Sequence, residues 1–193
     1  MQNNLLLCGV GGQGIVLTSK LIAATAMAQQ IPVMSAETIG MAQKGGSVFS
    51  FLRLGDGLYC PMFPEKTADL LIAFEPAEAV RMLPYLRDGG QVVLNTHAIM
   101  PVTATLSGAS YTGTEMIGYL KAHTEKLLLI DGDAACTALG SPKVLNMVML
   151  GAAIRAGILP FTVDDIDAVM RRTVKPQFAE LNSKALRYEA SGT

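Results

Sequence analysis

The sequence predicts an α/β fold, a Rossmann-like sandwich with a mainly parallel sheet and a helical C-terminal third. Short apolar runs alternate with helical stretches as far as residue 131, which is the pattern of strands separated by helices. Beyond residue 140 the strand signals stop and helix-boundary residues take their place. Because 193 residues fit one medium domain and are few for two, residues 1–193 are expected to form a single domain.

The first strand is expected at residues 5–10, LLLCGV, because a continuous apolar run is typical of a strand buried on both faces. A helix over 14–30 and a strand over 33–36 follow, and together they would close a βαβ unit with a right-handed crossover. The same signals place the remaining strands at 47–54, 68–74, 91–95 and 126–131, and further helices at 76–87 and 114–124.

Capping residues mark the helices of the C-terminal third. Ser141 followed by proline begins a helix that Gly157 can end in a left-handed conformation. Thr162 and Asp165 have the spacing of a capping box for a helix over 163–173, and Pro176 opens a final amphipathic helix.

Composition narrows the classes of partner. The 15 basic and 16 acidic residues form no run of either sign, so neither nucleic acid nor an anionic membrane is expected to bind. Only 16% of residues are charged, where about a quarter is usual. We favour a surface partly covered by another subunit over a well-buried sheet as the explanation. A membrane span is not expected, because Asn146, Arg155 and Pro160 interrupt the longest apolar stretch.

The three cysteines, Cys8, Cys60 and Cys136, are dispersed and form no CxxC pair. They therefore predict neither a disulfide framework nor a metal or iron-sulfur site in this chain. The first residues, MQNNLLLC, lack the pattern of a signal peptide, so a cytoplasmic location is expected.

Gly9, Gly11 and Gly14 have the spacing of a dinucleotide-binding loop between the first strand and the first helix. Glycines permit left-handed turns, and the free N–H groups of a helix start attract a phosphate or carboxylate. A nicotinamide site would also need an acid on the second strand, for which Glu37 is the candidate, slightly late at 23 residues after Gly14. The alternatives are an anion or nucleotide site and a turn that only packs helix against sheet.

The segment SAETIGMAQKGGS, residues 35–47, combines a carboxylate, hydroxyls, an amide, an amine and glycines in a connection without hydrophobic periodicity. Ligands bind α/β proteins at the carboxyl ends of the strands. We therefore expect this segment and the first glycine loop to be neighbours at a binding site. A polar surface loop is the alternative.

Lesser candidates lie further along the chain. Asn95 ends a strand on the expected ligand side, and Asn146 lies on a helix that is apolar nearly all round, so each has either a structural or a ligand-binding role. His97 and His123 have no second ligand at suitable spacing, and no catalytic residue is expected. The pair Asp131 and Asp133 is interpreted as a turn that caps the next helix rather than as a metal or ribose site.

Four segments, GVGGQG, SAETIGMAQKGGSVFSFLRLG, ADLLIAFEPAEA and GGQVVLNT, resemble the gamma-type domain of 2-oxoacid:ferredoxin oxidoreductases, and in particular its indolepyruvate branch. The likeness runs from about residue 5 to the helix that contains Asn146. In this chain the first family loop is matched by Gly9, Gly11, Gly12, Gln13 and Gly14, and the second, more specific motif by Glu37, Thr38, Gly40, Gln43, Gly45, Gly46 and Ser47.

The resemblance implies a two-chain enzyme that converts an arylpyruvate, coenzyme A and oxidised ferredoxin into an arylacetyl-CoA, carbon dioxide and reduced ferredoxin. Thiamine diphosphate and the iron-sulfur clusters would belong to the large partner subunit, so this small non-redox subunit should be inactive alone. Our hypothesis is that the two loops, with Asn95 and Asn146, hold coenzyme A near that partner; an intersubunit contact alone is the alternative for the second loop. The rival functions are an independent NAD(P)-dependent oxidoreductase and a stand-alone coenzyme A or nucleotide-binding module.

Overall fold

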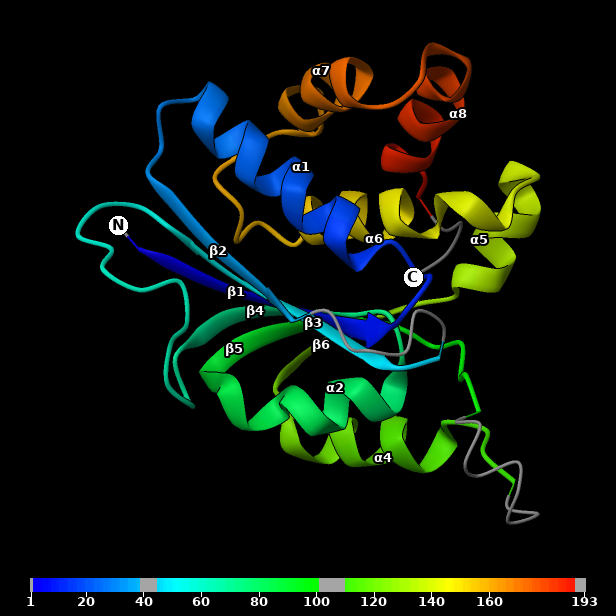
Figure 1. Cartoon of the computed structure of the whole chain (residues 1–193). Helices are drawn as coiled ribbons and strands as arrows, with labels where there is room; N and C mark the ends of the chain where they lie inside the picture. The colour runs from blue at the N-terminus through cyan, green and yellow to red at the C-terminus, as the bar shows by residue number, and fades with distance from the viewer. Residues whose placement is uncertain (1, 39–44, 101–109, 190–193) are drawn as a thin grey trace.

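Helices cover both faces of one six-stranded sheet in the computed structural model, which describes residues 2–38, 45–100 and 110–189 (Figure 1). One face carries α1, α5 and α6 with α7 and α8 stacked outside them, and the other carries α2 and α4. The strands are β1 (Asn3–Val10), β2 (Val33–Thr38), β3 (Ser47–Leu54), β4 (Ala68–Ala73), β5 (Leu86–Asn95) and β6 (Lys126–Ile130). The helices are α1 (Ile15–Ala28), α2 (Pro76–Met82), α4 (Thr114–His123), α5 (Gly132–Leu139), α6 (Leu145–Arg155), α7 (Val163–Thr173) and α8 (Pro176–Leu186), with short 3-10 turns at Leu83–Tyr85 and Pro142–Val144.

The sheet confirms the α/β prediction, with one antiparallel strand. Its order is β2-β3-β1-β4-β5-β6, and β3 runs antiparallel to both of its neighbours while β1, β4, β5 and β6 are parallel. The prediction of a first βαβ unit needs one correction. Strand β2 does not pair with β1, because β3 lies between them. A parallel neighbour needs a connection of about a dozen residues or more. Since β3 follows β2 after a shorter one, it pairs antiparallel.

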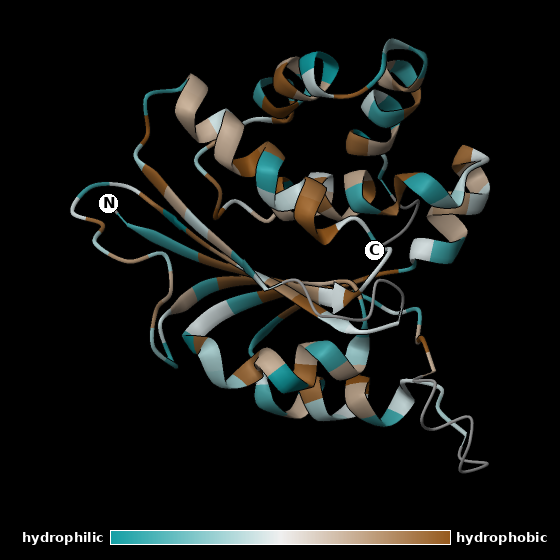
Figure 2. Cartoon of the chain, in the orientation of Figure 1, coloured by the Kyte–Doolittle hydropathy of each residue, from teal (hydrophilic) through white to brown (hydrophobic). Residues whose placement is uncertain are grey.

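The central strand β1 is buried on both faces, as its apolar run predicts. Leu5 and Leu7 belong to the core beneath α1 and α6, whereas Leu6 and Cys8 belong to the core on the α2 side. Complete burial of each leucine stabilises the fold by about 1.5–3 kcal/mol. Hydrophobic residues accordingly gather along the strands and α6, and hydrophilic residues are frequent on α7 and α8 (Figure 2).

Two helix boundaries differ from the sequence prediction. The helix expected over 76–87 ends at Met82, because Pro84 has no N–H to continue the helical bonds, and β5 already begins at Leu86 rather than at residue 91. The helix expected from Pro142 is a 3-10 turn followed by α6, and Ser141 caps the turn by accepting the Lys143 N–H at 3.3 Å.

The remaining capping predictions are confirmed. The capping box of α7 is present, and Gly157 has a left-handed φ of 81°. Within the described residues no single helix is long and apolar enough to cross a membrane, although α5 and the stretch Pro142–Arg155, bent by 119°, pass that test as a pair.

Candidate functional site

The first glycine loop is closed by the side chain of Gln13. Its Oε1 accepts the Val10 N–H at 2.7 Å, and its Nε2 donates to the Phe74 carbonyl at the end of β4 at 2.8 Å. A Cβ on Gly9 would lie 2.6 Å from Gln13 Oε1. Gly12 and Gly14 turn the chain into α1 with φ of 108° and 86°, values that glycine adopts at low cost. Both polar atoms of the Gln13 amide therefore serve the backbone.

Asn95 fixes the neighbouring strand ends in the same way. Its side chain is completely buried; Nδ2 donates to the Phe74 carbonyl at 3.0 Å, and Oδ1 accepts the N–H of Gly132 at 3.1 Å. Phe74 thus accepts from two side-chain amides. The ends of β1, β4 and β5 and the start of α5 are held in one arrangement, and Asn95 has a structural role there.

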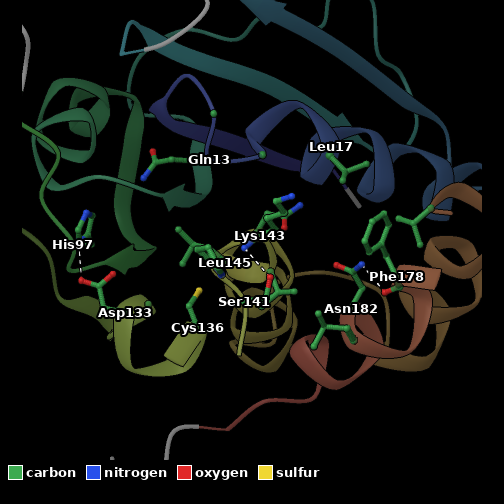
Figure 3. A pocket seen from close by; sticks show the side chains of 18 of the residues that line it. Gln13, Leu17, His97, Asp133, Cys136, Ser141, Lys143, Leu145, Phe178 and Asn182 are labelled. Atoms are coloured by element: carbon green, nitrogen blue, oxygen red, sulfur yellow. Dashed lines mark hydrogen bonds and ion pairs between the residues drawn. The ribbon is translucent and has the colours of Figure 1, made fainter. Parts of the chain in front are cut away.

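A cavity of about 680 Å³ opens beside these strand ends, between the start of α1 and the helices α5, α6 and α8 (Figure 3). This volume lies within the usual range of ligand pockets, about 300–1,000 Å³. His97 and Asp133 lie at one side of the cavity, Leu17 and Phe178 lie at the other, and Ser141 and Lys143 lie between them. The cavity therefore offers an ion pair at one side and, at the other, the apolar side chains of Leu17 and Phe178 with the amide of Asn182 beside them.

Asn146 brings the first turn of α6 against the glycine loop. A Cβ on Gly14 would lie 2.9 Å from Asn146 Cβ, so this contact requires glycine. Asn146 is 5% exposed and lines the cavity, so its side-chain amide borders the space that a ligand would fill. An amide at a cavity wall can both donate to and accept from a polar group of a ligand.

His97 is paired with a carboxylate, which corrects the expectation of a lone histidine. Its Nδ1 lies 2.6 Å from Asp133 Oδ2, and both residues line the cavity. Each follows the carboxyl end of a strand, β5 or β6, which is the signal that could have predicted the pair. Asp131 caps α5 by accepting the Ala134 N–H at 2.9 Å, as expected from the turn.

Cys136 also lines the cavity and was not predicted there. Burial, followed by the charge of Asp133, raises the pKa of the Cys136 thiol. A thiol with a raised pKa is a poor nucleophile at neutral pH. The raised pKa therefore gives no support to Cys136 as a nucleophile in this cavity.

The described residues of the second glycine segment contact the first loop and are not among the residues that line the cavity. Gly11 donates its N–H to the Gly46 carbonyl at 2.9 Å, which confirms that the two segments are neighbours. Ser47 Oγ donates to Glu78 at 2.5 Å, and Gly45 has a left-handed φ of 80°. The predicted residues Gly40 and Gln43 lie outside the described residues.

Glu37 and Thr38 end β2, the edge strand. Because β3 separates β2 from β1, Glu37 lies two strand spacings, about 9.5 Å, to the side of β1. In a nicotinamide site the acidic strand is the direct neighbour of the glycine-loop strand. The structure therefore does not reproduce the geometry on which the NAD(P) alternative depends.

The protein is an α/β protein of the Rossmann-like class. Its sheet contains one inserted antiparallel strand, and its pocket lies where the glycine loop leads into α1. The chain belongs to the pyruvate ferredoxin/flavodoxin oxidoreductase family, whose model matches residues 4–190. It is 38% identical to the indolepyruvate oxidoreductase subunit IorB of Archaeoglobus fulgidus, over 97% of this chain and 93% of that protein.

Two solved structures share the fold. A keto/oxoacid ferredoxin oxidoreductase gamma subunit from Geobacter sulfurreducens superposes with a TM-score of 0.68 at 20% identity, over 96% of this chain and 94% of that one. The second is the 2-oxoglutarate:ferredoxin oxidoreductase of Magnetococcus marinus, with 2-oxoglutarate, coenzyme A and succinyl-CoA bound. It superposes with a TM-score of 0.71 at 19% identity, over 96% of this chain and 30% of that one.

Proposed function

We propose that this chain is the small, non-redox subunit of an indolepyruvate, or more generally arylpyruvate, ferredoxin oxidoreductase. With a large subunit that carries thiamine diphosphate and iron-sulfur clusters, it would take part in the oxidative decarboxylation of the 2-oxoacid to an acyl-CoA, with reduction of ferredoxin. The extent of the likeness to the Archaeoglobus fulgidus subunit, over nearly the whole of both chains, supports this proposal.

Coenzyme A is the ligand that we assign to the cavity. The observation that carries this assignment is the position of Asn146, whose nearly buried side chain lines the cavity beside the glycine-loop start of α1. The first N–H groups of α1 and the ammonium of Lys143 suit phosphate groups, and the wall formed by Leu17 and Phe178 suits an uncharged portion of the ligand. The residues present therefore fit coenzyme A, which supplies the thiol that accepts the acyl group.

An Asn146→Asp variant of the purified two-subunit complex tests the assignment. The added carboxylate keeps the side-chain shape but repels phosphate, so the KM for coenzyme A should rise about tenfold, equivalent to about 1.4 kcal/mol. The KM for indolepyruvate should not change. Both constants are measured by ferredoxin reduction. The matched control is Gln30→Glu, an exposed position beyond the far end of α1. An unchanged KM for coenzyme A in Asn146→Asp would place coenzyme A elsewhere.

Two simple measurements separate the rival functions. Thermal stabilisation of the purified chain by NADH or NADPH would favour an independent oxidoreductase and contradict the proposal. Purification from the native organism distinguishes the subunit from a stand-alone module, because the subunit should elute with an iron-sulfur partner and the module should elute alone.

A further inference from the structure

The first turn of α2 carries two buried carboxylates that the proposed coenzyme A site does not use. Glu75 is 1% exposed and Glu78 is 6% exposed, and neither lines the cavity. Both belong to the segment ADLLIAFEPAEA. A buried carboxylate is costly unless donors compensate it, so the donors that reach these two residues matter for their stability.

The donor on Glu78 comes from the second glycine segment. Ser47 Oγ donates to Glu78 Oε2 at 2.5 Å, across 31 positions of sequence. The adjacent residue, Gly46, accepts the N–H of Gly11 at 2.9 Å. Contacts therefore run without interruption from Glu78, through Ser47 and Gly46, to the glycine loop at the mouth of the cavity. Arg81 also approaches Glu78, at 3.4 Å, but its side chain is 62% exposed, and such pairs contribute little.

Glu75 is the N-cap residue of the same helix, α2. Its Oε1 accepts the Tyr111 hydroxyl at 2.6 Å, and its Oε2 accepts the N–H of Glu78 at 3.0 Å. The Tyr111 oxygen in turn accepts the Ala77 N–H at 3.0 Å. Burial, followed by the hydrogen bond to Glu75, raises the pKa of Tyr111, so the phenol remains a donor at neutral pH. Glu75 thereby fixes the helical turn that presents Glu78 to Ser47.

We propose that Glu78 is a positioning residue for coenzyme A binding: by holding Ser47, it fixes Gly46 against Gly11 and keeps the loop at residues 11–14 in its binding conformation. This inference rests on the proposed function for the identity of the ligand. Because Gln13 closes the loop independently, loss of Glu78 should displace the loop without unfolding it.

The test compares Glu78→Ala with the conservative Glu78→Gln in the purified two-subunit complex. Loss of the acceptor in Glu78→Ala should raise the KM for coenzyme A roughly tenfold, since displacements of about 1 Å near a site cost one to two orders of magnitude. The KM for the 2-oxoacid should not change. Glu78→Gln retains an oxygen that accepts the Ser47 hydroxyl, so its KM for coenzyme A should stay near the wild-type value. The control, Arg81→Ala, removes only the exposed ion pair and should match the wild type.

Hydrogen exchange of the peptide that covers residues 45–54 gives a readout that is independent of turnover. Exchange at its first residues should rise in Glu78→Ala and remain at the wild-type rate in Glu78→Gln and Arg81→Ala. Ser47→Ala removes the same hydrogen bond from the other side, so it replaces Glu78→Ala if that variant does not fold.

Two results would overturn the inference: an unchanged KM for coenzyme A in Glu78→Ala and Ser47→Ala, or an equal loss of function in Glu78→Gln and Glu78→Ala. A wild-type complex without coenzyme A-dependent turnover would instead overturn the proposed function. The exchange comparison would then still decide whether Glu78 positions the segment.

Discussion

At the scale of single residues, two glycines of one loop provide a matched pair. Gly14 and Gly12 both have left-handed φ values, but a Cβ on Gly14 would press against Asn146 whereas a Cβ on Gly12 would meet open space. Gly12→Ala should cost about 1–2 kcal/mol of stability from backbone strain alone. Gly14→Ala should cost about 1–3 kcal/mol more, because it also forces apart the packed first turns of α1 and α6. Urea denaturation measures both; equal losses would show that the Asn146 contact is not rigid.

The same residues show how far a site can be predicted from sequence. The glycine spacing located the start of α1, and the isolated polar residue of an apolar helix, Asn146, does lie beside it. The roles of Gln13 and Asn95 could not be predicted, because their partner, the Phe74 carbonyl, lies 61 and 21 positions away in sequence. His97 and Asp133 are also distant in sequence, and only the order of the strands brings them together.

At the scale of elements, the capping box of α7 can be tested directly. Thr162 Oγ1 accepts the Asp165 N–H at 3.2 Å, and the Asp165 carboxylate accepts the Thr162 N–H at 2.7 Å. Thr162→Ala should lower the free energy of unfolding by about 1 kcal/mol at pH 7. Thr162→Ser keeps the hydroxyl and serves as the control. Circular dichroism in urea measures each variant.

The pH dependence of this cap has a defined sign. Hydrogen bonds from the Thr162 side chain and backbone lower the pKa of Asp165 below its ordinary 3.8. A carboxyl with a lowered folded-state pKa contributes stability above the unfolded value, and that contribution is lost as the pH falls through the folded pKa. The difference in the free energy of unfolding between Thr162→Ala and the wild type should therefore be largest at neutral pH and shrink below about pH 4. A difference that grows with acid would contradict the geometry.

Elements were predictable where the signal is local, and their arrangement was not. The strand at Ser47–Leu54 and the helix at Val163–Thr173 have the predicted bounds. Both the alternation of side-chain polarity in a strand and the capping of a helix depend on a few consecutive residues. The insertion of β3 between β2 and β1 depends on the length of a connection and on pairing with a strand about 40 residues earlier. That insertion moves Glu37 away from the glycine loop and removes the basis of the nicotinamide alternative.

At the scale of the whole molecule, the fold gathers its glycine segments, the cavity and the two carboxylates of α2 near the carboxyl ends of the strands, where open α/β sheets bind ligands. The opposite end of the sheet carries the β3–β4 loop with the exposed Tyr59 and Met62. Because the proposed coenzyme A site lies at the first of these two ends, we expect a partner subunit to meet the edge that holds the cavity. In the Magnetococcus marinus enzyme the same fold matches 30% of a longer chain, so this fold also occurs joined to other parts of an oxidoreductase.

Reconstitution tests the whole molecule. If the chain supplies the coenzyme A pocket and the partner supplies the redox groups, neither purified subunit should reduce ferredoxin with indolepyruvate and coenzyme A, whereas the mixture should. Assembly should also slow hydrogen exchange in residues 10–14 and 45–47, because both segments lie at the expected contact edge, while the exposed β3–β4 loop should exchange at an unchanged rate. Full activity of the large subunit alone would contradict the division of roles. Protection confined to the β3–β4 loop would place the partner at the opposite end of the sheet and separate the cavity from the interface.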